Sequence, residues 1–326
     1  MKFRKKIILV LCALTLVLGL AACKNTADNS KQDANSAGAD TSQTNPDTKT
    51  SDRETTYPAV ITDSQGQEIT IESEPMKVIS MAPGITELLF KLGKEDKLIG
   101  RTTYCDYPEE AAKIEPVGTL QKPDIEKIIS LEPDVVIAST HFSEESEKQL
   151  TDLGVKVLVL YEEHDMEGVY SMIETLGTIL NANNNAAKII DEMKTSIETT
   201  TKAIEGKEAP SVYYVVGFGE YGDYTAGGDT FISQLITLAG GENIAKDVSG
   251  WSYSLESLVE ADPDFIIIAD DMKDSFVTAD VYKDLSAVKS GHVYGIDKNL
   301  LERQGYRSAQ GIETLAKILH PEAFQE

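Results

Sequence analysis

Few residues of this chain could do covalent chemistry, and they form no recognisable catalytic motif. The sequence contains no GxSxG, HExxH or P-loop, and Cys105 has no histidine near it along the chain. An enzyme needs an activated nucleophile beside a base, or a cradle for phosphate, so these absences argue against catalysis. Carboxylates are abundant, however, and an acid pair assembled by folding stays open as an alternative.

A second chemical signal is the glycine pattern GFGEYG at residues 217–222. A dinucleotide site needs its third glycine to open a helix that faces the pyrophosphate. Here residues 223–229 intervene before the next expected helix, and Glu220 would repel phosphate. We instead expect Phe218 and Tyr221 to form an aromatic loop at the mouth of a binding cleft, with local packing as the alternative.

The histidines do not predict a metal site. His141, His164, His292 and His320 lie in separate segments without the paired spacing that aims two imidazoles at one ion. The run EEHD at residues 162–165 gathers acidic groups, but contiguous side chains cannot easily converge on one ion. We therefore expect a solvated loop there and no bound metal.

The first 23 residues have the pattern of a secretory signal. Four basic residues within positions 2–6 precede an apolar run at residues 7–20, which is short for a membrane span. The sequence LAAC ending at Cys23 resembles the bacterial lipobox, in which the cysteine is acylated. This resemblance implies that residues 1–22 are a signal peptide and that Cys23 carries a lipid anchor; an uncleaved anchor is the alternative.

Residues 23–56 are expected to be the lipidated cysteine and a disordered linker. Residues 24–56 contain no Val, Ile, Leu, Met, Phe, Tyr or Trp, so they cannot bury enough apolar surface to offset the entropy of ordering. Cys12 leaves with the signal and Cys23 is used for lipid, so Cys105 remains alone. No disulfide framework is then possible.

Net charge limits the partners. The chain has 30 Lys and Arg against 54 Asp and Glu, a formal charge of −24, and four of the cations belong to the signal peptide. Nucleic acids and anionic membranes both need a basic face. We therefore expect neither as a partner, apart from the lipid anchor.

A long amphipathic helix is the element around which the rest is arranged. Residues 182–205 contain no Gly or Pro, and Ala186, Ile190, Met193 and Ile197 recur on one helical face. The asparagines at 183–185 predict an N-cap, and Gly206 predicts the end. A helix roughly 35 Å long could connect two lobes rigidly.

An internal repeat lies on either side of this helix. IEKIISLEPDVVI at residues 125–137 and LESLVEADPDFII at residues 255–267 match at a Glu, a Pro, an Asp and an Ile. Each copy predicts a short helix, a Pro-Asp turn and a buried strand, and strands alternate with helices in both halves. The fold class is therefore α/β, with two lobes, each a mostly parallel sheet flanked by helices. We place them at residues 57–181 and 207–326, joined by the helix at 182–206.

Several motifs together identify a family. The segments SMAPGITELLFKLG, YCDYPEEAAKIEPVGTLQ, DIEKIISLEPDVVIAS and GGDTFISQLITLAGGENIAKD, with AKILHPEAF near the end, resemble the helical-backbone (class III) solute-binding proteins of ABC importers. That class includes cobalamin-binding and ferric-siderophore- or haem-binding proteins. The resemblance implies a monomeric lipoprotein on the outer face of the cytoplasmic membrane. It would capture a metal chelate between its lobes and deliver it to a permease dimer, with no cofactor and no catalysis.

The resemblance also implies ligand-binding residues. Tyr104, in the Tyr-x-Asp-Tyr-Pro loop, and Trp251 match stacking aromatics of the cobalamin binder, and Arg303 matches a hydrogen-bond donor, with Arg307 following it. An anionic siderophore or a propionate would pair with Arg307. Leu120 stands where the cobalamin binder has a stacking Trp. The ligand therefore stays open among cobalamin, ferric siderophores and haem.

In the family, one glutamate on each lobe docks into arginine pockets of the permease, and the matching positions are Glu126 and Glu256. A glutamate in the first turn of a helix also favours the helix dipole, which is the simpler reading of each alone. Two alternatives to chelate binding remain: a Zn or Mn binder of the same fold class, and an exported lipoprotein enzyme.

Overall fold

The computed structural model describes residues 53–161, 164–219 and 222–325. The signal sequence, Cys23 and the linker as far as residue 52 lie outside this part, and so does Tyr221. None of the helices in the described ranges is both long enough and apolar enough to cross a membrane.

The first lobe is built on a four-stranded parallel sheet with the strand order β4-β3-β5-β6. Its strands are β3 (Val78–Ser80), β4 (Leu98–Arg101), β5 (Val135–Ala138) and β6 (Val157–Val159). Its helices are α1 (Pro83–Lys91), α2 (Ile125–Ser130) and α3 (Glu144–Asp152). A hairpin precedes this sheet; its strands are β1 (Ala59–Thr62) and β2 (Glu68–Ile71), paired antiparallel.

The second lobe repeats this plan with the strand order β12-β11-β7-β9, also parallel. The strands are β7 (Ser211–Val215), β9 (Glu242–Asn243), β11 (Phe265–Ala269) and β12 (Val293–Ile296). The helices are α6 (Phe231–Leu238), α7 (Leu255–Ala261), α8 (Lys273–Thr278), α9 (Ser286–Ser290), α10 (Asn299–Glu302) and α11 (Ser308–Leu319). A small ribbon of β8 (Asp223–Tyr224) and β10 (Ser252–Tyr253) stands apart from this sheet. Counted within each lobe, the strand order of both sheets is 2-1-3-4, so the lobes share one topology.

The aspartates in the matched Pro-Asp turns of the repeat make equivalent hydrogen bonds in both lobes. The Asp134 carboxylate accepts the backbone N–H of Met76 and Lys77, just before β3. The Asp264 carboxylate accepts the backbone N–H and the hydroxyl of Ser211, the first residue of β7. Each turn therefore fixes the start of the neighbouring central strand, which explains why the repeat is visible in the sequence.

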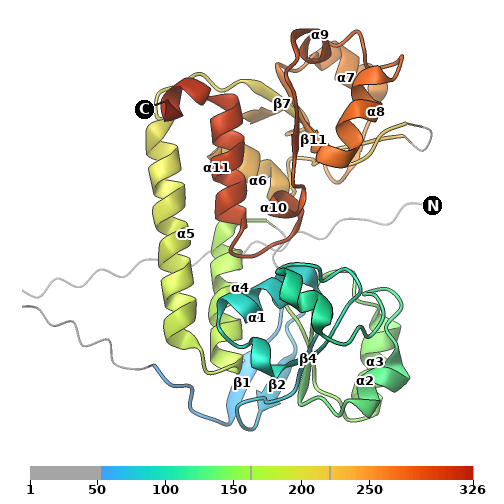
Figure 1. Ribbon diagram of the computed structural model, residues 1–326, viewed down its shortest axis with the longest axis vertical. Coiled ribbons are helices and arrows are strands. Elements are labelled where there is room, and N and C mark those ends of the chain that lie inside the picture. Colours follow the sequence, from blue (N-terminus) through green and yellow to red (C-terminus); the bar gives the residue numbers. More distant parts are fainter. Residues whose placement is uncertain (1–52, 162–163, 220–221, 326) are drawn as a thin grey trace, which may run out of the picture. The chain divides into compact units, whose positions relative to one another are not determined.

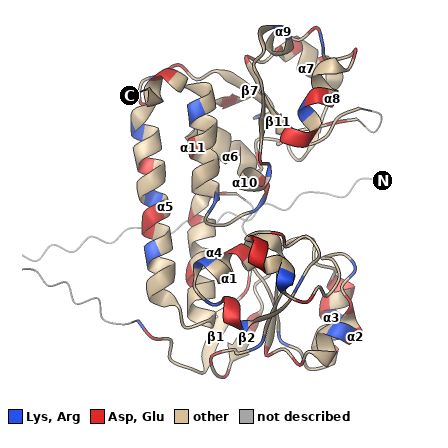
Figure 2. Ribbon diagram, viewed as in Figure 1, with Lys and Arg blue, Asp and Glu red and all other residues tan. Residues whose placement is uncertain are grey.

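The long helix is α5 (Asn183–Ala203), with 21 residues, and it runs beside α4 (Met166–Ile179) and α11 (Figure 1). Its buried residues are Ala186, Ile189, Ile190, Met193 and Thr200, while Lys, Asp and Glu occupy its outer side (Figure 2). The helix ends at Ala203 with Ile204 as its C-cap, shortly before Gly206 at φ +75°, close to the predicted end.

The predicted asparagine N-cap of α5 is wrong, because the cap position is Ala182 and no side chain caps it. The Asn183 amide instead donates to the Arg53 carbonyl and the Thr55 hydroxyl, at 2.9 and 2.8 Å. Tyr57 donates its hydroxyl to the Ile179 carbonyl in the same place. The start of the described chain is thus fixed to the turn between α4 and α5.

One hydrophobic cluster runs through both lobes. It joins the face of the first sheet at Val78 and Ile137 to α4 and α5, and continues to Val212 and Ile267 of the second sheet. Two separate clusters cover the outer faces of the two sheets. The inner faces therefore share a core with the α4–α5 pair.

Candidate functional site

A cavity of about 760 Å³ lies between the lobes, at the carboxyl ends of both sheets. In the first lobe its wall comes from residues 82–85 after β3 and residues 139–141 after β5. In the second lobe it comes from Val216 after β7 and residues 298–304 after β12. Ligands of parallel α/β sheets bind at carboxyl strand ends where neighbouring connections diverge, as they do between β3 and β5. Both lobes therefore present their binding edges to one cavity.

The cavity is walled mainly by apolar and neutral polar groups, as small-molecule sites usually are. The lining includes Leu120, Tyr161, Met172, Phe231, Ile232, Trp251 and Leu301. Trp251 is 47% exposed, so its ring is available to a ligand. The volume and the half-exposed indole suit a bulky ligand with a flat face.

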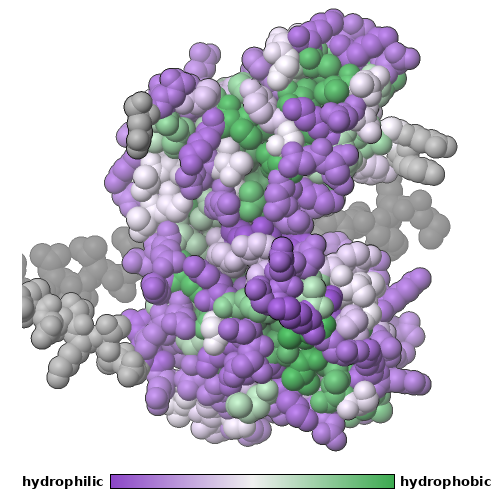
Figure 3. All heavy atoms as spheres, viewed as in Figure 1, coloured by the Kyte–Doolittle hydropathy of each residue, from purple (hydrophilic) through white to green (hydrophobic). Residues whose placement is uncertain are grey.

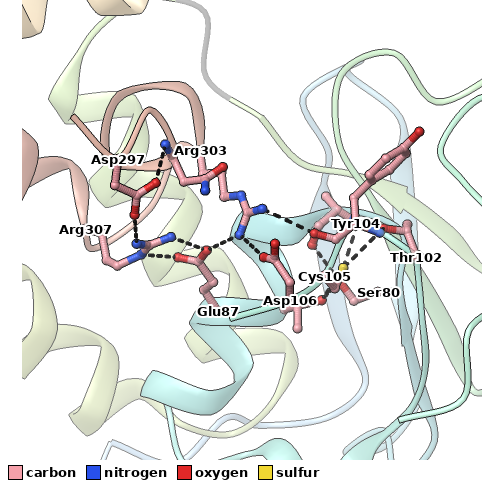
Figure 4. A network of polar contacts seen from close by, with 12 residues as sticks. Ser80, Glu87, Thr102, Tyr104, Cys105, Asp106, Asp297, Arg303 and Arg307 are labelled. Atoms are coloured by element: carbon pink, nitrogen blue, oxygen red, sulfur yellow. Dashed lines mark hydrogen bonds and ion pairs between the residues drawn. The ribbon is translucent and has the colours of Figure 1, made fainter. Parts of the chain in front are cut away.

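Tyr104 lies next to this cavity rather than on its wall. It is 61% exposed and lines a neighbouring hollow of about 350 Å³ together with Leu120 and His141, which line both spaces. Its ring points away from the polar network below it (Figure 4). The two predicted stacking residues therefore flank a continuous region rather than face each other across one pocket.

His141 has an unusual backbone conformation for a residue on this wall. Its φ of +67° falls in the left-handed region, which non-glycine residues seldom adopt. Such strain is often found at functional positions. The sequence assigned His141 no role in a metal site and gave no sign of this conformation, because left-handed backbone cannot be predicted from a single histidine.

Arg303 and Arg307 are both held by Glu87 of α1, across the boundary between the lobes (Figure 4). Arg303 donates from Nη1 to Glu87 Oε1 at 2.9 Å and to Asp106 Oδ1 at 2.7 Å. Arg307 donates from Nε and Nη2 to the two oxygens of Glu87, at 2.7 and 2.6 Å. The Glu87 and Arg307 side chains are only 4% and 6% exposed. This is a buried, bidentate pair, with short charge-assisted hydrogen bonds that fix the relative orientation of the two side chains.

Two more carboxylates complete this network. Asp106 pairs with Arg303, and Asp297 pairs with Arg307 at 3.3 Å, so three carboxylates meet two guanidinium groups. Partial burial raises the pKa of Asp106, but the hydrogen bond from Arg303 and its charge outweigh burial and lower it overall. Strongly hydrophilic residues accordingly gather where the lobes meet on the face drawn in Figure 3.

Close backbone packing holds the network in place. A Cβ added to Gly84 at the start of α1 would lie 2.4 Å from the Gln304 carbonyl oxygen. Only glycine allows this approach of residues 303–305 to α1. Arg307 also stacks on Tyr107, with its guanidinium carbon 4.2 Å from the ring centroid.

Sequence reasoning missed Glu87. It lies in the segment ITELLF, where Ile85, Leu88 and Leu89 are buried with it, so it looked like an ordinary helix residue. The available signal was the pair of arginines four residues apart at 303 and 307, which needs acidic partners if it is buried.

The other predicted site residues lie elsewhere. Phe218 does not line the cavity; it packs edge-on against Phe276 and Tyr282, at centroid distances of 5.1 and 5.6 Å. Tyr221 lies outside the described residues. The predicted docking residues Glu126 and Glu256 are both exposed, each at the second position of its helix, α2 or α7.

Cys105 is buried and forms no disulfide within the described residues, which contain no other cysteine. Burial raises the pKa of its thiol, although hydrogen bonds with Thr102 and Thr86 oppose this. Within the described residues, no group of three or more His, Cys, Asp or Glu side chains is arranged to hold a metal ion.

Known proteins resemble most of this chain. An uncharacterised ABC transporter substrate-binding lipoprotein of Bacillus subtilis, YvrC, is 34% identical over 315 residues, 94% of this chain and 95% of that protein. A cobalamin-binding protein of Halobacterium salinarum is 27% identical over 284 residues, 82% of this chain and 76% of that protein.

The fold is also found in solved structures. The periplasmic haem-binding protein RhuT from Roseiflexus matches with a TM-score of 0.70 at 22% identity, over 77% of this chain and 99% of its own. A sequence profile described as periplasmic binding protein matches residues 78–300. Because that profile spans most of the chain and the Bacillus relative almost all of it, the chain belongs to the periplasmic binding protein family.

Proposed function

We propose that this protein is the solute-binding lipoprotein of an ABC importer, and that it captures a metal chelate between its lobes. The observation that carries the proposal is the cavity of about 760 Å³ at the carboxyl ends of both sheets, with Trp251 half exposed on its wall. The chelate is cobalamin, a ferric siderophore or haem. The protein performs no chemistry on it and passes it to a permease dimer.

Anchoring fits this role. Cys23 carries the lipid in our proposal and holds a monomer on the outer face of the cytoplasmic membrane. The linker joins the folded part at residues 53–57, where Thr55 accepts the Asn183 amide and donates to the Thr178 carbonyl. The tether therefore ends at the turn between α4 and α5, and not at the cavity.

Tryptophan fluorescence tests the proposal directly, because Trp251 is the only tryptophan in the chain. A soluble form, residues 24–326, is titrated with cobalamin, haem and a panel of ferric siderophores. We expect saturable quenching by one of these classes, with binding weakened by Tyr104→Ala, which removes an aromatic ring beside the cavity. Tyr224→Ala is the control, because Tyr224 is also exposed but does not line the cavity.

Lack of response to every chelate would overturn the proposal. Quenching by Zn²⁺ or Mn²⁺ instead would favour a metal-ion binder. Turnover of a ligand during the titration, seen as a new product by chromatography, would favour an enzyme.

A further inference from the structure

The arginine and the lysine that line the cavity already have carboxylate partners. Arg303 is the only arginine among the described residues that line it, and its Nη1 contacts both Glu87 and Asp106. Its Nη2 donates to the Tyr104 carbonyl at 3.3 Å. A guanidinium recognises a carboxylate by offering two parallel donors. Two carboxylates already balance the charge of Arg303, so it is a weaker partner for an anionic ligand than an unpaired guanidinium would be.

Lys298 is the one lysine on the described part of the wall, and it too has an acidic neighbour. Its Nζ lies 3.9 Å from Glu302 Oε2, one helical turn later. Both side chains are partly exposed, so this pair is weak. Together they add no net charge to the cavity.

The second lobe also places an anion on the cavity wall. Asp229 lines the cavity, and its carboxylate accepts hydrogen bonds from the Ser249 hydroxyl and the Gly250 N–H. These neutral donors lower its pKa, with a smaller contribution from His164, so it is fully ionised at neutral pH. The two internal segments outside the described residues contain Glu162, Glu163, Glu220 and Tyr221, and thus no Lys or Arg.

We infer that this cavity selects a chelate of zero or positive net charge and rejects chelates that carry free carboxylates. An anion that enters the cavity would lose hydration and be repelled by the Asp229 carboxylate. It would gain little in return, because both arginines are already paired with Glu87. Like charges placed together at an interface are unfavourable, so repulsion of anions sets the selectivity as much as attraction does. The inference rests on the proposed function, because it names which chelates that site accepts.

The test uses pairs of chelates that share a metal centre and differ at the periphery, where one member has a neutral group and the other a free carboxylate. One pair is cyanocobalamin and its hydrolysis product with a free side-chain carboxylate. The others are haem dimethyl ester with haem, and a linear ferric trihydroxamate capped by an acetyl or a succinyl group. Each is titrated against Trp251 fluorescence at pH 8, where unperturbed imidazoles are neutral.

We expect the member without free carboxylates to bind at least about tenfold more tightly in whichever class binds. Equal or tighter binding of the carboxylate member would overturn this inference and leave the proposed function standing. Absence of binding in all three pairs would overturn both. The two failures are therefore distinguishable.

A pair of matched variants tests the cause. Asp106→Asn removes one carboxylate from Arg303 and should reduce the discrimination about threefold, the scale of an exposed ion pair. Asp152→Asn is the control, since Asp152 is 63% exposed and paired with Lys148, while Asp106 is 67% exposed and paired with Arg303. Equal discrimination in both variants would refute the role assigned to Arg303.

Discussion

At the scale of single residues, the ion pairs with Glu87 change the role assigned to Arg303 and Arg307. Sequence resemblance implied that Arg303 and Arg307 bind the ligand, and Arg303 does lie on the cavity wall. Yet both donate to Glu87, 216 and 220 residues away along the chain. No local pattern can show such a pairing, which is why residue types could be predicted here and their partners could not.

Glu87→Gln should lower the free energy of unfolding by about 3 kcal/mol or more. The amide keeps one acceptor oxygen but no charge, so Arg307 stays buried with only Asp297 to compensate it. Urea unfolding measures the loss. Glu192→Gln is the matched control, because Glu192 is half exposed beside Lys91, and we expect a change below about 1 kcal/mol. A loss for Glu87→Gln as small as that of the control would contradict the prediction.

At the scale of elements, most of the structure could be predicted from apolar periodicity. The expected helix at 182–205 is α5 at Asn183–Ala203, and the helix and strand expected in residues 125–137 are α2 and β5. The predicted asparagine N-cap of α5 was wrong because the Asn183 side chain instead donates hydrogen bonds to residues 53–55, about 130 positions earlier. Local helix propensity predicts that an asparagine caps its own helix, and it contains no information on hydrogen-bond partners far away along the chain.

A second set of long-range hydrogen bonds joins separate elements at Glu74, which precedes β3. Burial raises the pKa of Glu74, but hydrogen bonds from Lys97, Lys94 and Asn181 outweigh it and lower the pKa to about 2. A carboxylate with a lowered pKa in the folded state stabilises the fold above its ordinary pKa. That stabilisation is lost as the pH falls from about 4.5 to about 2.

Glu74→Gln should therefore reduce stability at pH 7 and flatten its pH dependence in this acid range. Urea unfolding at a series of pH values compares the variant with the wild type. Glu132→Gln serves as the control, because Glu132 is 83% exposed beside Lys77. If the wild type and Glu74→Gln lost stability in parallel between pH 4.5 and 2, the contribution assigned to Glu74 would be wrong.

At the scale of the whole folded part, the internal repeat accounts for the shared core and for the position of the cavity. Both sheets have the same strand order, and one hydrophobic cluster joins their inner faces to α4 and α5. The duplication could be predicted from the matched Glu, Pro and Asp. The cavity itself could not, because its wall comes from at least six separate loops.

The same duplication places Glu126 and Glu256 at equivalent exposed positions, the second residues of α2 and α7. Two carboxylates at matched points of two lobes could set the register of docking on a permease dimer, since complementary charge fixes orientation at interfaces. We expect the double variant Glu126→Ala and Glu256→Ala to bind its chelate with unchanged affinity by Trp251 fluorescence.

The same double variant should lose most uptake by cells and most affinity for the permease in detergent, because the cavity is intact and only the docking charges are gone. Glu145→Ala with Glu260→Ala is the control, since both glutamates are exposed, one on each lobe, and the change in net charge is identical. Equal losses in the two double variants would mean that overall charge, and not these two positions, governs docking. Full uptake with Glu126 and Glu256 replaced would rule out docking through this pair and direct the search to other exposed groups of the two lobes.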